Sequence, residues 1–138
     1  MSVPEHLWRF PTAASVESLA RRFGLPNRAD MQDWPWEVAD AARLDEFLTV
    51  YETGGLTDDE RFTLMEILLQ SFEDRARSHG FDPRWDRALE ALDRNIDLHA
   101  YSVWYWSDVE NELEEDQWLV TPSLRQVLRK HQARLARS

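Results

Sequence analysis

The residues best equipped for chemistry lie in one stretch, where large aromatic side chains run directly into carboxylates. Four aromatic residues fall within 101–106 and six carboxylates within 108–116, with no basic residue among them. They are Tyr101, Trp104, Tyr105 and Trp106, then Asp108, Glu110, Glu112, Glu114, Glu115 and Asp116, with Trp118 shortly after. This composition suits three kinds of chemistry: metal binding, general-base catalysis, or contact with a cationic partner.

A calcium site is the first of these, because Asp108, Glu110 and Glu112 alternate like the first ligands of a calcium-binding loop. That loop needs Gly at its sixth position and Glu at its twelfth, where this chain has Leu113 and Leu119. The chain also has no Cys, and none of its four His lie three or four residues apart. We therefore expect no metal and no cofactor. We interpret residues 108–117 as a solvated loop or as a frayed extension of the preceding helix.

Signals for catalysis are sparse in this sequence. It contains neither a G-x-S-x-G motif nor a glycine-rich phosphate loop. His99 falls on an apolar helical stripe, which favours a hydrogen-bonded core histidine over a catalytic one. We expect no enzymatic activity. Two alternatives stay open: a small enzyme that uses Asp108 or Glu110 as a general base beside aromatic walls, and a structural subunit of a bacterial assembly.

Length and charge restrict the class of protein. The 138 residues, 43% of them hydrophobic, suffice for one core and predict a single helical domain over 1–138. A net charge of −10 argues against nucleic acid and acidic membranes and favours a cationic protein partner. No apolar run approaches a membrane span and no secretion signal begins the chain, so we expect a cytoplasmic protein. The sequence is compatible with a homo-oligomer.

Apolar spacing predicts an all-α fold, a compact bundle of about five helices. We expect them at 15–23, 33–54, 57–79, 83–107 and from 121 onward, with Ser15 as the cap of the first and a short extended segment at 118–120. The clearest local signal is a capping box between Thr57 and Glu60. Apolar steps of three and four from Trp85 to Trp106 predict one long helix, with room for a kink at Asn95. The short link at 80–83 makes this helix antiparallel to 57–79, as a central pair.

The two tryptophans near the end of that long helix differ in direction. On a helix, Trp104 and Trp106 point about 200° apart, so one can be buried while the other is exposed. An exposed aromatic residue beside carboxylates is typical of an interface anchor. The predicted partner-binding residues are Trp104, Trp106, Asp108, Glu110, Glu112, Glu114, Glu115, Asp116 and Trp118.

The chain resembles the bacterial immunity proteins that neutralise secreted polymorphic or contact-dependent toxins. The likeness rests on small size, acidity, absence of cysteine and an aromatic-acidic patch. The residues that carry it are 95–99, 104–107, 108–116 and 118–122. The resemblance implies a cytoplasmic inhibitor that covers the active site of a basic toxin domain.

Overall fold

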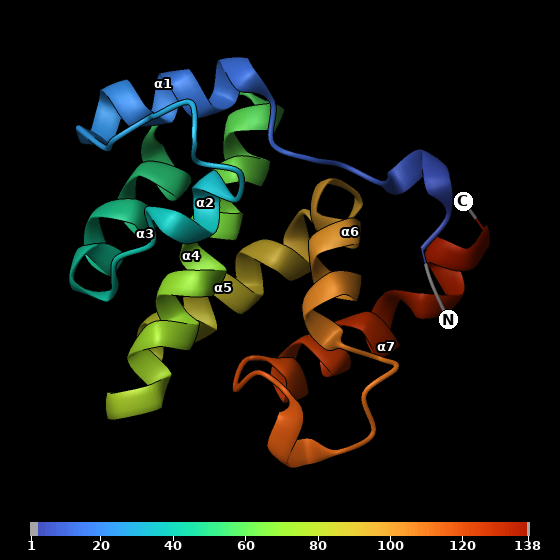
Figure 1. The fold of residues 1–138 in the computed structure, drawn as a ribbon. Coiled ribbons are helices and arrows are strands. Elements are labelled where there is room, and N and C mark those ends of the chain that lie inside the picture. Colours follow the sequence, from blue (N-terminus) through green and yellow to red (C-terminus); the bar gives the residue numbers. More distant parts are fainter. Residues whose placement is uncertain (1–2, 138) are drawn as a thin grey trace. The chain divides into compact units, whose positions relative to one another are not determined.

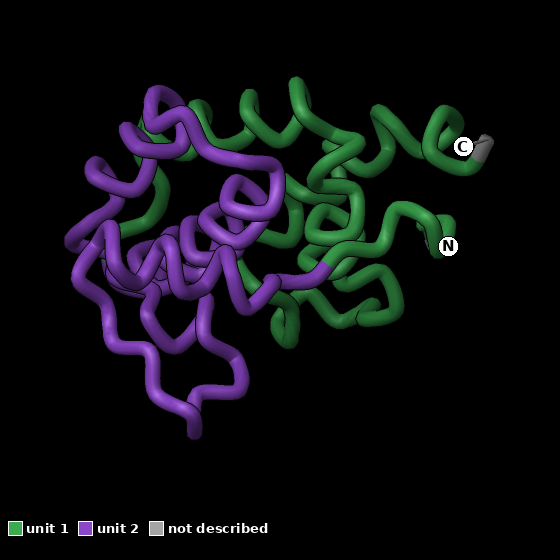
Figure 2. The backbone as a smooth tube through the Cα atoms, turned by 90° about the horizontal axis from the view of Figure 1, so that it is seen from above, with its two compact units in different colours: residues 1–9, 79–138 green, residues 10–78 purple. Residues whose placement is uncertain are grey.

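A computed structural model describes residues 3–137, and every regular element within that range is a helix (Figure 1). The predicted all-α fold is confirmed. Seven α-helices and three short 3-10 helices occupy these residues in place of the predicted five. The chain divides into two compact units, one of residues 10–78 and one of residues 1–9 with 79–138 (Figure 2). The single domain over 1–138 and the antiparallel pair of 57–79 and 83–107 both stay predictions, since the pair's members belong to different units.

The unit of residues 10–78 is built around its longest helix. Its elements are α1 (Ala13–Phe23), α2 (Trp34–Glu37), the 3-10 helix η2 (Ala41–Arg43), α3 (Leu44–Thr53) and α4 (Asp58–His79). Helix α4 begins at the predicted capping box: the Glu60 amide donates to Thr57 Oγ1 at 3.2 Å, and the Thr57 amide donates to Glu60 Oε1 at 2.9 Å. From Phe62 to Leu69 all its side chains are buried, as expected of a central helix.

Two boundaries in this unit differ from the prediction. Helix α1 begins at Ala13 because Thr12, and not Ser15, is its cap: the two side chains accept each other's backbone amides, both at 3.1 Å. The helix predicted over 33–54 is interrupted at Asp40. There the Asp40 side chain accepts from the Ala42 amide at 2.9 Å, and the Asp40 amide donates to Ser71 Oγ at 3.0 Å. This local cap starts a new helical segment.

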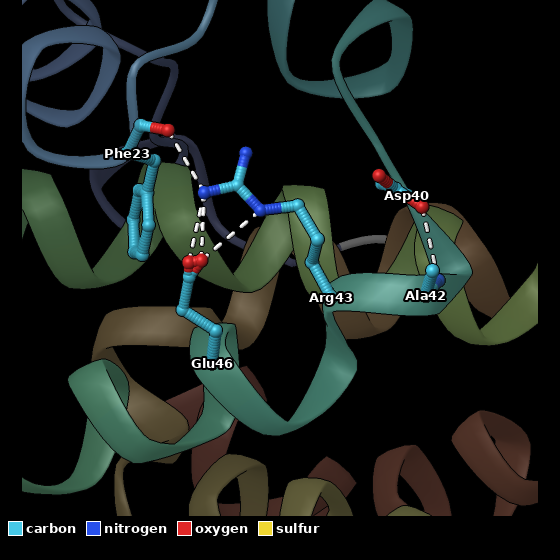
Figure 3. Close-up of polar contacts among 5 residues, drawn as sticks. All are labelled: Phe23, Asp40, Ala42, Arg43 and Glu46. Carbon is cyan, nitrogen blue, oxygen red and sulfur yellow. Dashed lines mark hydrogen bonds and ion pairs between the residues drawn. The ribbon is translucent and has the colours of Figure 1, made fainter.

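An arginine joins the end of α1 to the start of α3 (Figure 3). Arg43 Nη2 donates to the Phe23 carbonyl at 2.8 Å and also to both oxygens of Glu46, at 2.6 and 2.8 Å. Its guanidinium carbon lies 5.7 Å and 5.5 Å from the ring centres of Phe23 and Phe47. Arg43 therefore satisfies a carbonyl left open at a helix end and neutralises a carboxylate with the same group.

The second unit contains η1 (Glu5–Leu7), α5 (Pro83–Arg94), α6 (Ile96–Ser107), η3 (Glu114–Asp116) and α7 (Thr121–Arg137). Helix α6 packs against α5, α7 and η1. The single helix predicted over 83–107 is wrong, because it breaks at Asn95, where the backbone leaves the helical region at φ −113° and ψ 41°. Both the amide and the side-chain Nδ2 of Asn95 donate to the Ala91 carbonyl, at 3.0 and 3.2 Å. A side chain that bonds its own helix in this way favours a bend.

The segment expected to be extended, 118–120, is a turn instead. The Thr121 amide donates to the Trp118 carbonyl at 3.1 Å, which closes the chain directly before α7. Within the described range, no helix is both long enough and apolar enough to cross a bilayer.

Candidate functional site

The loop between α6 and α7 (orange in Figure 1) is fastened by an arginine from α7. Arg125 Nε donates to the Ser107 carbonyl at 2.7 Å, and its Nη2 donates to the carbonyls of Asp108 and Asn111 at 2.6 and 2.8 Å. Nearby, the buried Thr121 hydroxyl donates to the Trp106 carbonyl at 2.8 Å. The last carbonyls of a helix lack partners inside it, and they attract cations. Arg125 and Thr121 supply the missing donors.

The loop also closes on itself through amide groups. Gln117 Nε2 donates to the Asn111 carbonyl at 2.9 Å, and the Leu113 amide donates to Asn111 Oδ1 at 3.2 Å. Asp108 ends α6 in the left-handed region, at φ 47° and ψ 50°, which Asp tolerates better than most residues. Its carboxylate accepts from Asn111 Nδ2 at 3.2 Å. The loop is thus shaped almost entirely by main-chain and amide groups.

The aromatic side chains form one connected cluster at the base of this loop. The ring of Trp118 stacks on Tyr105, with centres 5.6 Å apart, and tilts against Trp106 at 4.7 Å. Trp106 is only 1% exposed, so its place among the predicted partner-binding residues is corrected: it lies in the core and cannot be an exposed anchor. Trp104 and Trp118 are half-buried and keep part of their rings at the surface. One of the two helical tryptophans is therefore buried and the other accessible, as their spacing allows.

A shallow pocket of about 280 Å³ opens beside these rings. We call it the aromatic-acidic pocket, and its lining residues are Trp104, Tyr105, Asp108, Val109, Glu110 and Trp118. It brings together two of the three predicted tryptophans and two of the six predicted carboxylates. The other four acids, Glu112, Glu114, Glu115 and Asp116, are exposed and do not line it.

Most carboxylates of the acidic run (residues 108–116) take no part in holding the fold. Within the described residues, five of them have no hydrogen-bond or ion-pair partner for the side chain: Glu110, Glu112, Glu114, Glu115 and Asp116. Arg125 uses three donors on main-chain carbonyls and makes no ion pair with these carboxylates. The run is a concentrated negative charge to which no ion pair is made among the described residues.

Carboxylates elsewhere in the chain are held differently. A hydrogen bond from the Ser18 hydroxyl lowers the pKa of Glu60, and the Thr57 amide lowers it further. In the other unit, a hydrogen bond with His131 Nε2 at 2.6 Å and one from Lys130 Nζ at 3.0 Å lower the pKa of Asp93. These two carboxylates are charged and are held by hydrogen bonds within the fold.

Two features of the site could not be predicted from the sequence. Arg125 lies 14 residues or more from every carbonyl that it binds, so its role depends on how α7 packs against α6. The stacking of Trp118 on Tyr105 likewise depends on the turn that precedes α7.

Among the described residues, no group of three or more His, Cys, Asp or Glu side chains is arranged to hold a metal ion.

Comparison with protein families, with curated proteins and with solved structures finds no match to this chain. The site is therefore interpreted from its own geometry.

Proposed function

We propose that the chain is a protein-binding inhibitor that recognises a cationic partner through the acidic run and the aromatic-acidic pocket. The observation that carries this proposal is the set of five carboxylates without partners beside two half-buried tryptophans. Exposed aromatic anchors next to complementary charge are characteristic of protein interfaces. The immunity-protein resemblance adds the identity of the partner's class, a basic toxin domain whose active site the inhibitor covers.

The charge repulsion within the acidic run supports a role in binding a partner better than a role in stabilising the fold. Like charges so close together repel one another, and among the described residues no cation makes an ion pair with these five carboxylates. A cationic partner would remove that repulsion on contact, and the charge would accelerate the encounter by about 10–1000-fold over a neutral surface. The half-buried tryptophans would then slow dissociation, because truncating such anchors typically costs at least about 2 kcal/mol of binding.

The enzyme alternative draws less support from the same pocket. A general base must be held rigidly against the proton that it removes. Glu110 is exposed without a partner, and the Asp108 carboxylate is held by a single hydrogen bond from Asn111. This freedom suits a binding surface better than a preorganised catalytic site.

The test needs the partner, isolated by co-purification from the native host, and stopped-flow association at two ionic strengths. The test protein is the run variant, which carries Glu112→Gln, Glu114→Gln and Glu115→Gln. Its control removes three exposed acids elsewhere, at Glu17→Gln, Asp30→Asn and Asp58→Asn, so that both variants have the same net charge.

We expect the run variant to associate about tenfold more slowly at low salt, with a smaller difference at high salt. The control variant should stay within about threefold of the wild type, because its substitutions change the total charge and not the charge of the binding surface. The proposal would be overturned if the run variant associated at the wild-type rate at both ionic strengths. It would also be overturned if the run variant and the control variant were slowed equally.

A further inference from the structure

The size of the aromatic-acidic pocket limits what can occupy it. Sites that enclose a drug-sized ligand span roughly 300–1,000 Å³. This shallow pocket has about 280 Å³, at the lower end of that range, so it has room for a single large side chain and not for a folded segment. Its position beside the acidic run makes it the natural place for the partner's central contact.

The charge of the lining selects a cation. Asp108 and Glu110 are its only charged members, and both are acidic. Arg125, which lines a neighbouring pocket with Val109, has its guanidinium bound to the carbonyls of Ser107, Asp108 and Asn111. It makes no ion pair with Asp108 or Glu110, although its positive charge lies beside the Asp108 carbonyl.

The aromatic walls are held in place before anything binds. Trp118 is fixed by its stack on Tyr105 and its contact with the buried Trp106, and Trp104 packs against Tyr101 with ring centres 5.7 Å apart. A cation within about 6 Å of a tryptophan ring centre is attracted by the ring's negative face. Rings that are already ordered lose little freedom on binding, which favours affinity.

Resting on the function proposed above, we propose that this pocket receives one arginine side chain of the partner, with the guanidinium between the tryptophan rings and the carboxylates of Asp108 and Glu110. Arginine suits this lining better than lysine does. Its planar group stacks on aromatic faces and donates in two directions at once, whereas an ammonium is a compact and strongly hydrated point charge.

The experiment uses the whole protein and three capped tripeptides of the form glycine–X–glycine, with X as arginine, lysine or citrulline. Citrulline keeps the shape of arginine without its charge. Binding is followed by the indole N–H resonances of Trp104 and Trp118 in ¹⁵N-labelled protein. We expect saturable shifts with arginine at a Kd of about 1–20 mM, at least about fivefold weaker binding of lysine, and no saturation with citrulline.

Two matched variants assign the effect to the pocket. Asp108→Asn with Glu110→Gln removes two charges from the lining, and Asn tolerates the left-handed backbone at that position. Glu114→Gln with Glu115→Gln removes two charges from the same run outside the lining. The first pair should weaken arginine binding about tenfold or more, and the second by less than about twofold.

Trp118→Leu supplies an independent readout of the rings, followed at the Trp104 resonance. It should weaken arginine binding about fivefold or more, since the stacking face is lost.

The pocket proposal would be overturned if the arginine and citrulline tripeptides bound with equal affinity. It would also be overturned if the two double variants weakened arginine binding equally. These outcomes are separable from failure of the proposed function. If a cationic partner binds through the run but the arginine tripeptide gives no saturable shift, the function stands and the pocket proposal fails. If the tripeptide binds as expected and no cationic protein partner associates, the pocket stands and the inhibitor function fails.

Discussion

Two groups of carboxylates in this chain have the same chemistry and different surroundings. In the unit of residues 10–78, Glu46 binds Arg43, Glu60 binds Ser18 and Thr57, and Glu66 accepts from Trp36 Nε1 at 3.1 Å. In the acidic run, five carboxylates have no such partner within the described residues. The first group makes contacts that contribute to the fold, and the second makes no such contact within the described residues.

Two arginines at helix ends, Arg43 and Arg125, differ in the same way: one is paired with a carboxylate and the other is not. Arg43 and Arg125 each donate to carbonyls at the end of a helix, α1 and α6 respectively. Arg43 also neutralises Glu46, whereas Arg125 binds only main-chain oxygens although its helix directly follows the acidic run. A carboxylate close to an arginine in sequence is therefore not always its ion-pair partner.

The largest expected effect compares the same substitution in the two regions. Leu69→Ala in α4 removes a side chain that is 0% exposed, and we expect it to lower the unfolding free energy by about 2–5 kcal/mol. Leu113→Ala in the acidic run removes one that is 59% exposed and should change it by less than about 0.5 kcal/mol. Urea unfolding measures both. A loss below 0.5 kcal/mol for Leu69→Ala would show that α4 is not the central helix.

A smaller effect tests the arginine that fastens the loop. Arg125→Met keeps the apolar stem and removes three hydrogen bonds to carbonyls, so we expect a loss of about 1.5–3 kcal/mol in unfolding free energy. Amide exchange at 108–117 should accelerate with it. Arg129→Met is the control, an exposed arginine one turn further along α7. Equal losses in the two variants would contradict the role given to Arg125.

A prediction about pH concerns the paired acid of the second unit. Hydrogen bonds with His131 and then Lys130 lower the pKa of Asp93 below its ordinary value of 3.8. The folded state then binds this proton less tightly than the unfolded chain. The stabilisation is accordingly present above about pH 4 and is lost as pH falls through the lowered pKa. Asp93→Asn should be less stable than the wild type at pH 7, and the difference should shrink toward pH 2. A difference that does not depend on pH would refute the pairing.

The smallest expected effect concerns metal ions, which we expect to leave the Tm unchanged. If the acidic run contacts a protein and not a metal ion, thermal melts with EDTA and with added calcium should overlay. The spacing of its acids lacks the sixth and twelfth residues of a calcium loop. A large shift of Tm in either condition would contradict this prediction and indicate that the run binds a metal ion.

The sequence predicted well those features that depend on near neighbours. The capping box of Thr57 and Glu60, the end of α1 at Gly24 and the end of α4 at Gly80 follow from residues a few positions apart, and all three are confirmed. The loop character of 108–117 is confirmed as well, apart from the single 3-10 turn at Glu114–Asp116.

Features set by side chains that bond back to the main chain were missed. Unbroken apolar spacing hides the break at Asn95, because the side chain that bends the helix does not interrupt the stripe. The burial of Trp106 and the use of Arg125 depend on how α7 packs against α6 and on the turn before it. Spacing could show that Trp104 and Trp106 differ in direction. It could not show which of them is buried.

The most direct measurement of the difference between the two groups of carboxylates is a comparison of unfolding free energies at low salt. One protein is the run variant, with Gln at Glu112, Glu114 and Glu115. The other neutralises three paired acids, with Glu46→Gln, Glu60→Gln and Asp93→Asn, so both lose three charges.

We expect the paired-acid variant to lose about 1–3 kcal/mol, because its ion pairs are lost and its charge-assisted hydrogen bonds are replaced by weaker neutral ones. The run variant should equal the wild type within about 0.5 kcal/mol or be slightly more stable, because repulsion falls while no contact is lost. A run variant that loses as much stability as the paired-acid variant would contradict the account, since its carboxylates would then serve the fold.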